Sequence, residues 1–424
     1  MPSRQPSGRV DSPFRLNLEQ QKKRARELLN AALDGDVHAL GRFETHHPRT
    51  PPSPRLADAQ LVIARELGLP SWPRLKAHIA AMRAALDGMG RGGPPDAGMT
   101  TLHVRCGYDI HPALRTAGFV GDFLEVSDPI VQGPVLPGDD WLEHRARFIH
   151  EAFDRDIGDT LAGLKGVQAR LEAAARDYER VVIWTEHDSH DQLILARCLA
   201  QFDAGGRPKV LEIAGANSFP GNARFLGIGQ LPPEAMILLW RGRMAASDGD
   251  LALATRVWTA LRRPESTGLA DILRHDDGHL PDMRRAVRRH LQELPWVRDG
   301  LSLTERLTLE TVRDGQGIFG KIFGELLRTR DPLPTYGDLG YCDIVQAMLR
   351  AKEPPLDVDP DTQAADWPHW VLRLTPVGRA ILAGERDWLT CGPPERWVGG
   401  VSIRAGEPAW RWDEATSTAS HGTS

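Results

Sequence analysis

Residues 180–202 restrict the fold of this chain more than any other stretch of its sequence. Residues 181–184 are four apolar residues that suit a strand buried on both faces, and apolar residues at helical spacing begin at Leu193. A polar turn lies between them, in which Asp188 or Ser189 is placed to cap the helix. Strand, polar turn and helix form the unit of an open parallel sheet, whose ligands bind at the carboxyl ends of strands. We therefore expect any chemical site to lie in this turn, although its sequence does not state a reaction.

Three other segments have the pattern of strands that belong to the same sheet. They are short apolar runs bounded by turn residues, at 101–106, 121–126 and 209–213. Residues 141–178 form one long helical segment that leads into the strand at 181–184. Alternating strands and helices predict an α/β domain with a mainly parallel sheet over residues 99–230.

The N-terminal part of the chain is predicted to be helical. Residues 16–86 carry helical periodicity, and the piece ADAQLVIARELGLPSWPRLKAHI resembles the ankyrin-like helical module at the front of many bacterial proteins. That resemblance implies a surface that docks a protein partner. Residues 1–15 are rich in Pro, Ser and Arg and are expected to be a disordered lead-in. Residues 87–98, DGMGRGGPPDAG, are predicted to be a Gly/Pro linker at a domain boundary.

The C-terminal part is predicted to hold a further domain. Residues 231–295 favour a helical extension of the sheet domain. Residues 296–405 contain three helical segments and then a small antiparallel pair, which resembles a winged helix, and LTPVGRAIL resembles the wing-to-helix corner of bacterial regulators. Residues 296–424 carry 14 Lys and Arg against 19 Asp and Glu, a balance that argues against DNA as a partner. Residues 406–424 are expected to be a tail.

Four segments across the middle of the chain, LHVRCGYDI, SDPIVQGPV, IWTEHDSHDQL and FLGIGQL, carry a further resemblance. Together they resemble a family of uncharacterised bacterial proteins that have an α/β domain of unknown function. The resemblance spans residues 101–301 and implies a mainly parallel open sheet, set between the ankyrin-like helical module and the winged-helix-like α+β domain. It implies no reaction, because none of the four segments is a catalytic signature.

The strand ends supply the candidate site residues, which we expect to meet at one edge of the sheet. The polar turn supplies the candidate catalytic residues Glu186, His187, Asp188 and Asp191. The turn and the other strand ends supply the candidate ligand-binding residues Tyr108, Asp109, Ser127, Asp128, His190 and Asn217. Carboxylates and imidazoles gathered in one crevice can hold a divalent metal, or can divide into an acid and a base. The identity of any metal or cofactor stays unknown.

The same residues also have a structural interpretation. Asp188 is a good N-cap, Asp191 completes a pair that resembles a capping box, and acidic residues favour the first turn of a helix. Capping uses one or two of these groups rather than six, so the cluster as a whole favours a functional role. Cys106 is expected to be a small buried hydrophobic residue rather than a nucleophile. The nearby glycines lack the spacing of a dinucleotide fingerprint.

Composition argues against several classes of function. A formal net charge of -5 gives no general case for binding nucleic acid or an acidic membrane. The 4 cysteines form no CxxC pair, so the sequence suggests neither a zinc site nor a disulfide framework. No apolar run approaches the roughly 18 residues that span a bilayer. We therefore expect a cytoplasmic protein that does not enter a membrane.

Two classes of function remain open. In the first, the α/β domain binds a small polar or phosphorylated ligand and acts as a metal-assisted hydrolase or transferase. In the second, the chain is a ligand-sensing transcriptional regulator or a protein-docking adaptor that uses its winged-helix-like end. The dense polar turn favours ligand binding, and it leaves open whether the chain is an enzyme.

Overall fold

The structure, a computed structural model, describes residues 12–222, 224–275 and 278–422. The chain divides into two units. The first unit contains the described residues of 1–98, 108–121 and 214–243, and the second contains those of 99–107, 122–213 and 244–424. Within the described ranges, no helix has both the length and the apolar character needed to cross a bilayer.

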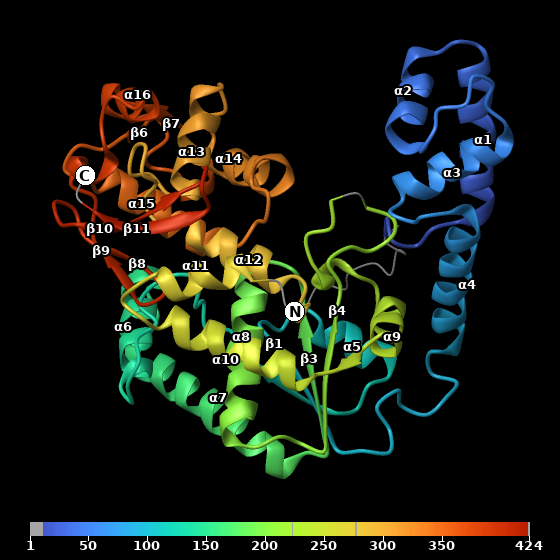
Figure 1. The fold of residues 1–424 in the computed structure, drawn as a ribbon, viewed down its shortest axis with the longest axis horizontal. Coiled ribbons are helices and arrows are strands. Elements are labelled where there is room, and N and C mark those ends of the chain that lie inside the picture. The colour runs from blue at the N-terminus through green and yellow to red at the C-terminus, as the bar shows by residue number, and fades with distance from the viewer. Residues whose placement is uncertain (1–11, 223, 276–277, 423–424) are drawn as a thin grey trace. The chain divides into compact units, whose positions relative to one another are not determined.

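The first unit is helical. Its helices are α1 (Leu18–Leu33), α2 (Val37–His46), α3 (Leu56–Glu66), α4 (Trp72–Gly88), α5 (His111–Ala117) and α9 (Pro233–Arg241). The side chains of Leu28, Phe43, Val62 and Leu75 meet in the core of α1–α4, where each is at most 2% exposed. The helical periodicity predicted for residues 16–86 is therefore confirmed as secondary structure (Figure 1).

Two expectations for the ends of this helical module need correction. Residues 12–15 are not a free lead-in, because Phe14 is 2% exposed and its ring centroid lies 5.8 Å from that of Phe219. The rest of the expected lead-in, residues 1–11, lies outside the described residues. The Gly/Pro linker at 87–98 is exposed over most of its length, but its Asp96 is buried. The carboxylate of Asp96 accepts hydrogen bonds from two backbone N–H groups of the same unit, so this end of the linker is held in place.

The second unit is built on a five-stranded sheet. The strands are β1 (Thr101–Arg105), β2 (Asp122–Glu125), β3 (Arg180–Thr185), β4 (Val210–Gly215) and β5 (Met244–Ala245). Their order is β2-β1-β3-β4-β5, with β1 parallel to both of its neighbours and β5 antiparallel to β4. Every residue of β1 is buried, as expected for a central strand covered on both faces. The prediction of a mainly parallel α/β sheet is confirmed.

Several helices pack with this sheet in the second unit (Figure 1). They are α6 (Trp141–Phe153), α7 (Ile157–Asp177), α8 (Ser189–Gly205), α10 (Asp248–Leu261), α11 (Thr267–Arg274) and α12 (Met283–Leu291). The single helix expected at 141–178 is in fact α6 and α7. Asp154 ends α6 in the left-handed region at φ 52°, and Asp156 caps α7 by accepting a hydrogen bond from the backbone of Asp159. Helix α8 packs against α7, α10 and α12, and 12 of its 17 residues are buried.

The C-terminal part of the second unit contains a second hydrophobic core. Its elements are α13 (Leu303–Arg313), α14 (Phe319–Glu325), a π-helical turn (Leu326–Arg330), α15 (Asp338–Leu349), β6 (Leu356–Val358), β7 (Leu372–Leu374) and α16 (Pro376–Leu382). Strands β6 and β7 pair antiparallel, and buried side chains from residues 301–391 form this core. Three helical segments are present as predicted. The antiparallel pair differs from the prediction, because β7 pairs with β6 and not with the strand expected at residues 397–403, which folds as a separate hairpin. The identity of the module as a winged helix stays a prediction.

The end of the chain returns to the core of the sheet. Strands β8 (Arg396–Val398) and β9 (Val401–Ile403) form one hairpin, and β10 (Ala409–Asp413) pairs with β11 (Thr418–Gly422). Residues 406–424 were expected to be a tail, but Trp412 is fully buried in the same core as β1. Its backbone exchanges hydrogen bonds with Pro295 and Val297, at 2.8 and 3.0 Å. A large apolar ring and paired backbone groups hold this segment, of which residues 423–424 lie outside the described chain.

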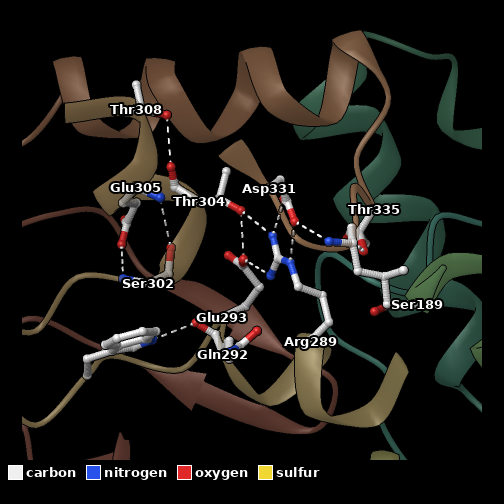
Figure 2. A network of polar contacts seen from close by, with 12 residues as sticks. Ser189, Arg289, Gln292, Glu293, Ser302, Thr304, Glu305, Thr308, Asp331 and Thr335 are labelled. Carbon is white, nitrogen blue, oxygen red and sulfur yellow. Dashed lines mark hydrogen bonds and ion pairs between the residues drawn. The ribbon is translucent and has the colours of Figure 1, made fainter. Parts of the chain in front are cut away.

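A buried ion-pair network joins α12 to the second core (Figure 2). Arg289, 2% exposed, donates to Asp331 at 2.8 and 3.1 Å, to Glu293 at 2.5 Å and to Thr304 at 2.9 Å. Burial acts to lower the pKa of Arg289, but the carboxylates of Asp331 and Glu293 outweigh it and raise that pKa. The guanidinium therefore stays charged and ties three elements together.

Candidate functional site

The strand order of the sheet reverses between β1 and β3. From β1 the chain passes to β2 at one edge, and from β2 it crosses to β3 on the other side of β1. In open α/β sheets ligands bind outside the carboxyl ends of the strands at such a reversal. Here those ends are Arg105 on β1 and Thr185 on β3, and residues 186–191 follow the second of them.

A buried arginine organises the polar turn after β3. Arg105 is 2% exposed, and its guanidinium donates to Glu186 at 2.9 Å and also to Asp191. The backbone N–H of Glu186 donates to the same Asp191 oxygen at 3.0 Å. Two of the four candidate catalytic residues are therefore ion-paired with one cation from the neighbouring strand.

Asp188 caps helix α8, as the sequence predicts. Its carboxylate accepts a hydrogen bond of 2.9 Å from the backbone N–H of Asp191. Burial, together with the nearby charges of Asp191 and Glu186, raises the pKa of Asp188 well above its ordinary value. A carboxyl group with a raised pKa close to two other carboxylates has the arrangement from which an acid and base pair can arise, so capping and chemistry are compatible at this position.

The three carboxylates of the turn are close enough to share a cation. Oxygen atoms of Glu186, Asp188 and Asp191 all lie within 4.8 Å of one another. Carboxylate oxygens are the ligands that Mg²⁺ and Ca²⁺ prefer. However, the guanidinium of Arg105 already supplies a positive charge to two of them, so a metal ion would have to compete with it. The three carboxylates therefore fit the role of an ion-paired helix cap better than that of a metal site.

Of two further residues in this region, Cys106 is a poor candidate nucleophile, whereas His187 keeps the neutral form that can accept a proton. The thiol of Cys106 donates to Asp191 at 3.0 Å, and burial followed by the Asp191 charge raises its pKa well above its ordinary value. A thiolate at neutral pH is therefore disfavoured. Burial and then the charge of Arg285 lower the pKa of His187, so this imidazole is neutral at physiological pH.

A cavity of about 600 Å³ lies next to this cluster along α8. Three of the predicted ligand-binding residues, Ser127, Asp128 and His190, line it together. Its other walls come from α6, α7 and α8 and from the first turn of α15. The apolar part of the lining includes Val131, Ile149, Leu164, Val167 and Leu339. The volume is in the range of small-molecule sites.

Asp128 of the cavity lining belongs to a buried ion pair. Arg145 is fully buried and donates twice to one oxygen of Asp128, at 2.7 and 2.9 Å. Its other N–H groups donate to three backbone carbonyls, so Arg145 is saturated with hydrogen bonds. The second oxygen of Asp128 is buried and has no hydrogen-bond partner among the described residues. Nη1 of Arg197 lies 3.9 Å from that oxygen.

The candidate residues thus fall into three groups. Glu186, His187, Asp188 and Asp191 lie together at the start of α8, and Ser127, Asp128 and His190 lie in the adjacent cavity. Tyr108, Asp109 and Asn217 belong to the first unit and form the third group. There the ring of Tyr108 packs against that of His111 with centroids 4.5 Å apart, and Asn217 Oδ1 accepts from Ser218 at 3.3 Å.

Sequence reasoning missed the arginines of both groups, Arg105, Arg145 and Arg197. Each is at most 2% exposed and lies in a strand or helix that is otherwise largely apolar on its buried side. A charged residue in such an element signals a buried partner, because an unpaired buried charge is costly. An arginine within an otherwise apolar strand or helix is visible in the sequence, so each of these three residues could have been identified as a member of a buried ion pair.

Comparison of the chain with models of protein families found no match, and comparison with curated proteins found none either.

Proposed function

We propose that the chain is a ligand-binding protein that holds a small polar molecule in the cavity between β2, α7, α8 and α15. The observation that carries this proposal is a set of buried polar atoms on the cavity lining. Asp128 Oδ2, His190 Nδ1 and two nitrogens of Arg197 have no hydrogen-bond partner in the described part of the chain. Buried polar groups nearly always have hydrogen-bond partners. A ligand that supplies partners for the side chains of Asp128, His190 and Arg197 would therefore bind more tightly and in one orientation.

The mixed lining also supports a small ligand with one polar end and one less polar end. Apolar side chains of α6 and α7 form one wall, whereas the unpaired atoms belong to residues after β2 and in α8. Pockets that bind small molecules usually combine apolar walls with a few fixed polar groups. The position near the carboxyl end of β2 is also where ligands of α/β sheets bind.

A variant that fills the cavity provides the test. Gly163 of α7 lines the cavity, and a β-carbon at this position would meet no atom within 4 Å. Gly163→Phe should therefore occupy the cavity without disturbing the helix. Gly166→Phe is the matched control, because Gly166 lies in the same helix, has the same open space and does not line the cavity.

The measurement is the shift in melting temperature with a panel of sugars, amino acids, nucleotides and phosphate esters. We expect at least one compound to raise the melting temperature of the wild-type chain and of Gly166→Phe, but not that of Gly163→Phe. A compound that stabilises all three proteins equally would place the ligand elsewhere, and a panel without any response would remove support for the proposal.

A second candidate function is metal-assisted hydrolysis or group transfer at the polar turn. It is favoured by the raised pKa of Asp188 beside the ion-paired carboxylates of Glu186 and Asp191. Calorimetry with Mg²⁺ and Mn²⁺ tests it. Binding by the wild-type chain that Asp191→Asn abolishes would support this function, and the absence of binding would favour the ion-paired cap.

The sensing alternative has a structural observation of its own. The first turn of α15, which belongs to the second core, forms part of the cavity wall. Gln132, on the segment after β2, donates to the Asp343 carboxylate of α15 at 2.6 Å and contacts Gly340. A ligand in the cavity would thus touch both the sheet and the C-terminal module, as a sensor of ligand occupancy requires.

A further inference from the structure

One cation on the cavity lining has no anion within hydrogen-bonding distance in the described chain. Arg197 is 2% exposed, and its Nη2 donates to Gln168 at 3.1 Å, while its guanidinium lies 4.9 Å from the centroid of the Trp141 ring. Its Nε and Nη1 atoms are buried and have no hydrogen-bond partner among the described residues. Burial lowers the pKa of Arg197, as expected for a charge that its surroundings do not compensate.

The neighbouring carboxylates do not supply that compensation. Asp128 is the nearest, but it is the partner of Arg145, which contacts it at 2.7 Å, whereas Arg197 is 3.9 Å away. Within the described chain, no other carboxylate oxygen lies within 4.0 Å of Arg197. The buried group of two arginines and one aspartate therefore carries one excess positive charge, and the Nε and Nη1 atoms of Arg197 have no hydrogen-bond partner in the described chain.

A second set of donors lines the same cavity. Helix α15 begins there, and its N-cap is Gly337, which has no side chain to accept from the first-turn N–H groups. The first turn is exposed. Asp338 accepts from the N–H of Leu339 at 2.9 Å, which places a carboxylate of the chain itself at the positive end of the helix.

We propose that the cavity binds an anionic oxygen group, the phosphate or the carboxylate of the small ligand. Arg197 Nε and Nη1 and the first-turn N–H groups of α15 are its donors. The inference rests on the proposed ligand binding in this cavity and narrows it to one chemical class. A guanidinium N–H donates a strong, charge-assisted hydrogen bond to an oxygen of a phosphate or carboxylate, and a helix N-terminus favours the same negative charge. The bound anion takes the place of the missing partner of Arg197 and competes with Asp338 for the helix N-terminus.

The test is titration calorimetry of the full chain with inorganic phosphate, acetate and ribose, at an ionic strength held constant with sodium chloride. Phosphate and acetate separate the two anions, and ribose is the neutral probe. We expect Arg197→Gln to weaken binding of the preferred anion by about tenfold or more, because charge-assisted bonds are lost. Removal of an uncompensated buried charge should leave the melting temperature of Arg197→Gln without any probe equal to that of the wild-type chain or higher.

Arg155→Gln is the matched control, because Arg155 is an exposed arginine of the same cavity lining. This substitution should change the affinity for the anion by less than about threefold.

Asp338→Ala gives a second and opposite expectation. Loss of its carboxylate frees the N–H of Leu339 and removes a like charge, so the anion should bind about threefold more tightly or better. The inference is overturned if neither anion binds, or if Arg197→Gln binds the anion as well as Arg155→Gln does. If ribose binds and Gly163→Phe abolishes that binding while both anions fail, the anion inference falls and ligand binding in the cavity stands.

Discussion

Replacement of Arg289 by methionine tests whether the buried network of Figure 2 holds the second core against the sheet domain. The substitution would leave the carboxylates of Asp331 and Glu293, 4% and 3% exposed, without their cation. Removal of one partner from a buried ion pair costs about 3–5 kcal/mol, because the other partner is left charged in a poorly polarisable environment. Thr304 would also lose its guanidinium donor.

Arg288→Met is the matched control for this substitution. Arg288 is the preceding residue of α12, and it pairs with Glu414 at 2.8 Å, but 37% and 38% of the two side chains are exposed. Exposed pairs contribute about 0–1 kcal/mol. The same chemical change at two adjacent positions should therefore differ in effect by several-fold.

The free energy of unfolding in urea, followed by tryptophan fluorescence, measures both effects. Hydrogen exchange of residues 301–391 then shows where the loss falls, since this core should open more often when Arg289 is replaced. Conversion of Asp331 and Glu293 to leucine in the Arg289→Met background should recover part of the loss, because an apolar replacement of a whole buried network is often neutral. Equal destabilisation by Arg288→Met and Arg289→Met, or unchanged exchange in residues 301–391, would refute this account.

Three further predictions follow from buried titratable groups and from charge. Asp188→Asn keeps the cap of α8 but cannot ionise. Because the folded pKa of Asp188 is raised, the stabilising contribution of its protonated carboxyl group is lost as the pH rises. The variant should therefore raise the melting temperature at pH 8 and raise it less at pH 4. Burial lowers the pKa of His290 from 6.5 to about 4, so the unfolded chain binds the proton first as the pH falls. The chain should lose up to about 3 kcal/mol of stability between pH 6.5 and 4, and His290→Leu should remove that part of the loss in unfolding experiments at both pH values. The full chain should bind duplex DNA weakly and in a salt-sensitive manner, and a gel-shift assay that finds tight, sequence-specific binding at physiological salt would contradict the acidic balance of residues 296–424.

Local patterns in the sequence predicted the sheet and the cap of α8. The apolar run at 181–184 and the acidic residue before Leu193 depend on neighbours within a few positions, and such signals survive in the fold as β3 and as the Asp188 cap. The ion pairs of the site could not be predicted in this way. Arg105 and Asp191 are 86 positions apart, so only the three-dimensional arrangement of β1 and β3 brings them together.

The boundaries of the sheet domain were harder to predict than its strands. Residues 108–121 and 214–243 follow directly on strands of the sheet, yet their contacts place them in the helical unit. Residues 406–424 have the polar composition of a tail, and the two tryptophans at its start were the only sign of burial. Which core a segment joins is decided by long-range packing, and periodicity carries no information about it.

The burial of Trp412 has a consequence for the way the chain is made. The sheet domain begins near residue 99, but its core includes Trp412 of β10, so more than 300 residues separate its first strand from its last buried ring. On the ribosome, the core that surrounds β1 stays incomplete until β10 has left the exit tunnel. A nascent chain stalled before this point exposes apolar surface that the finished protein covers, which makes it a substrate for chaperones. A premature stop codon after residue 405 should therefore lower the cellular abundance of the protein far more than the small number of missing residues suggests.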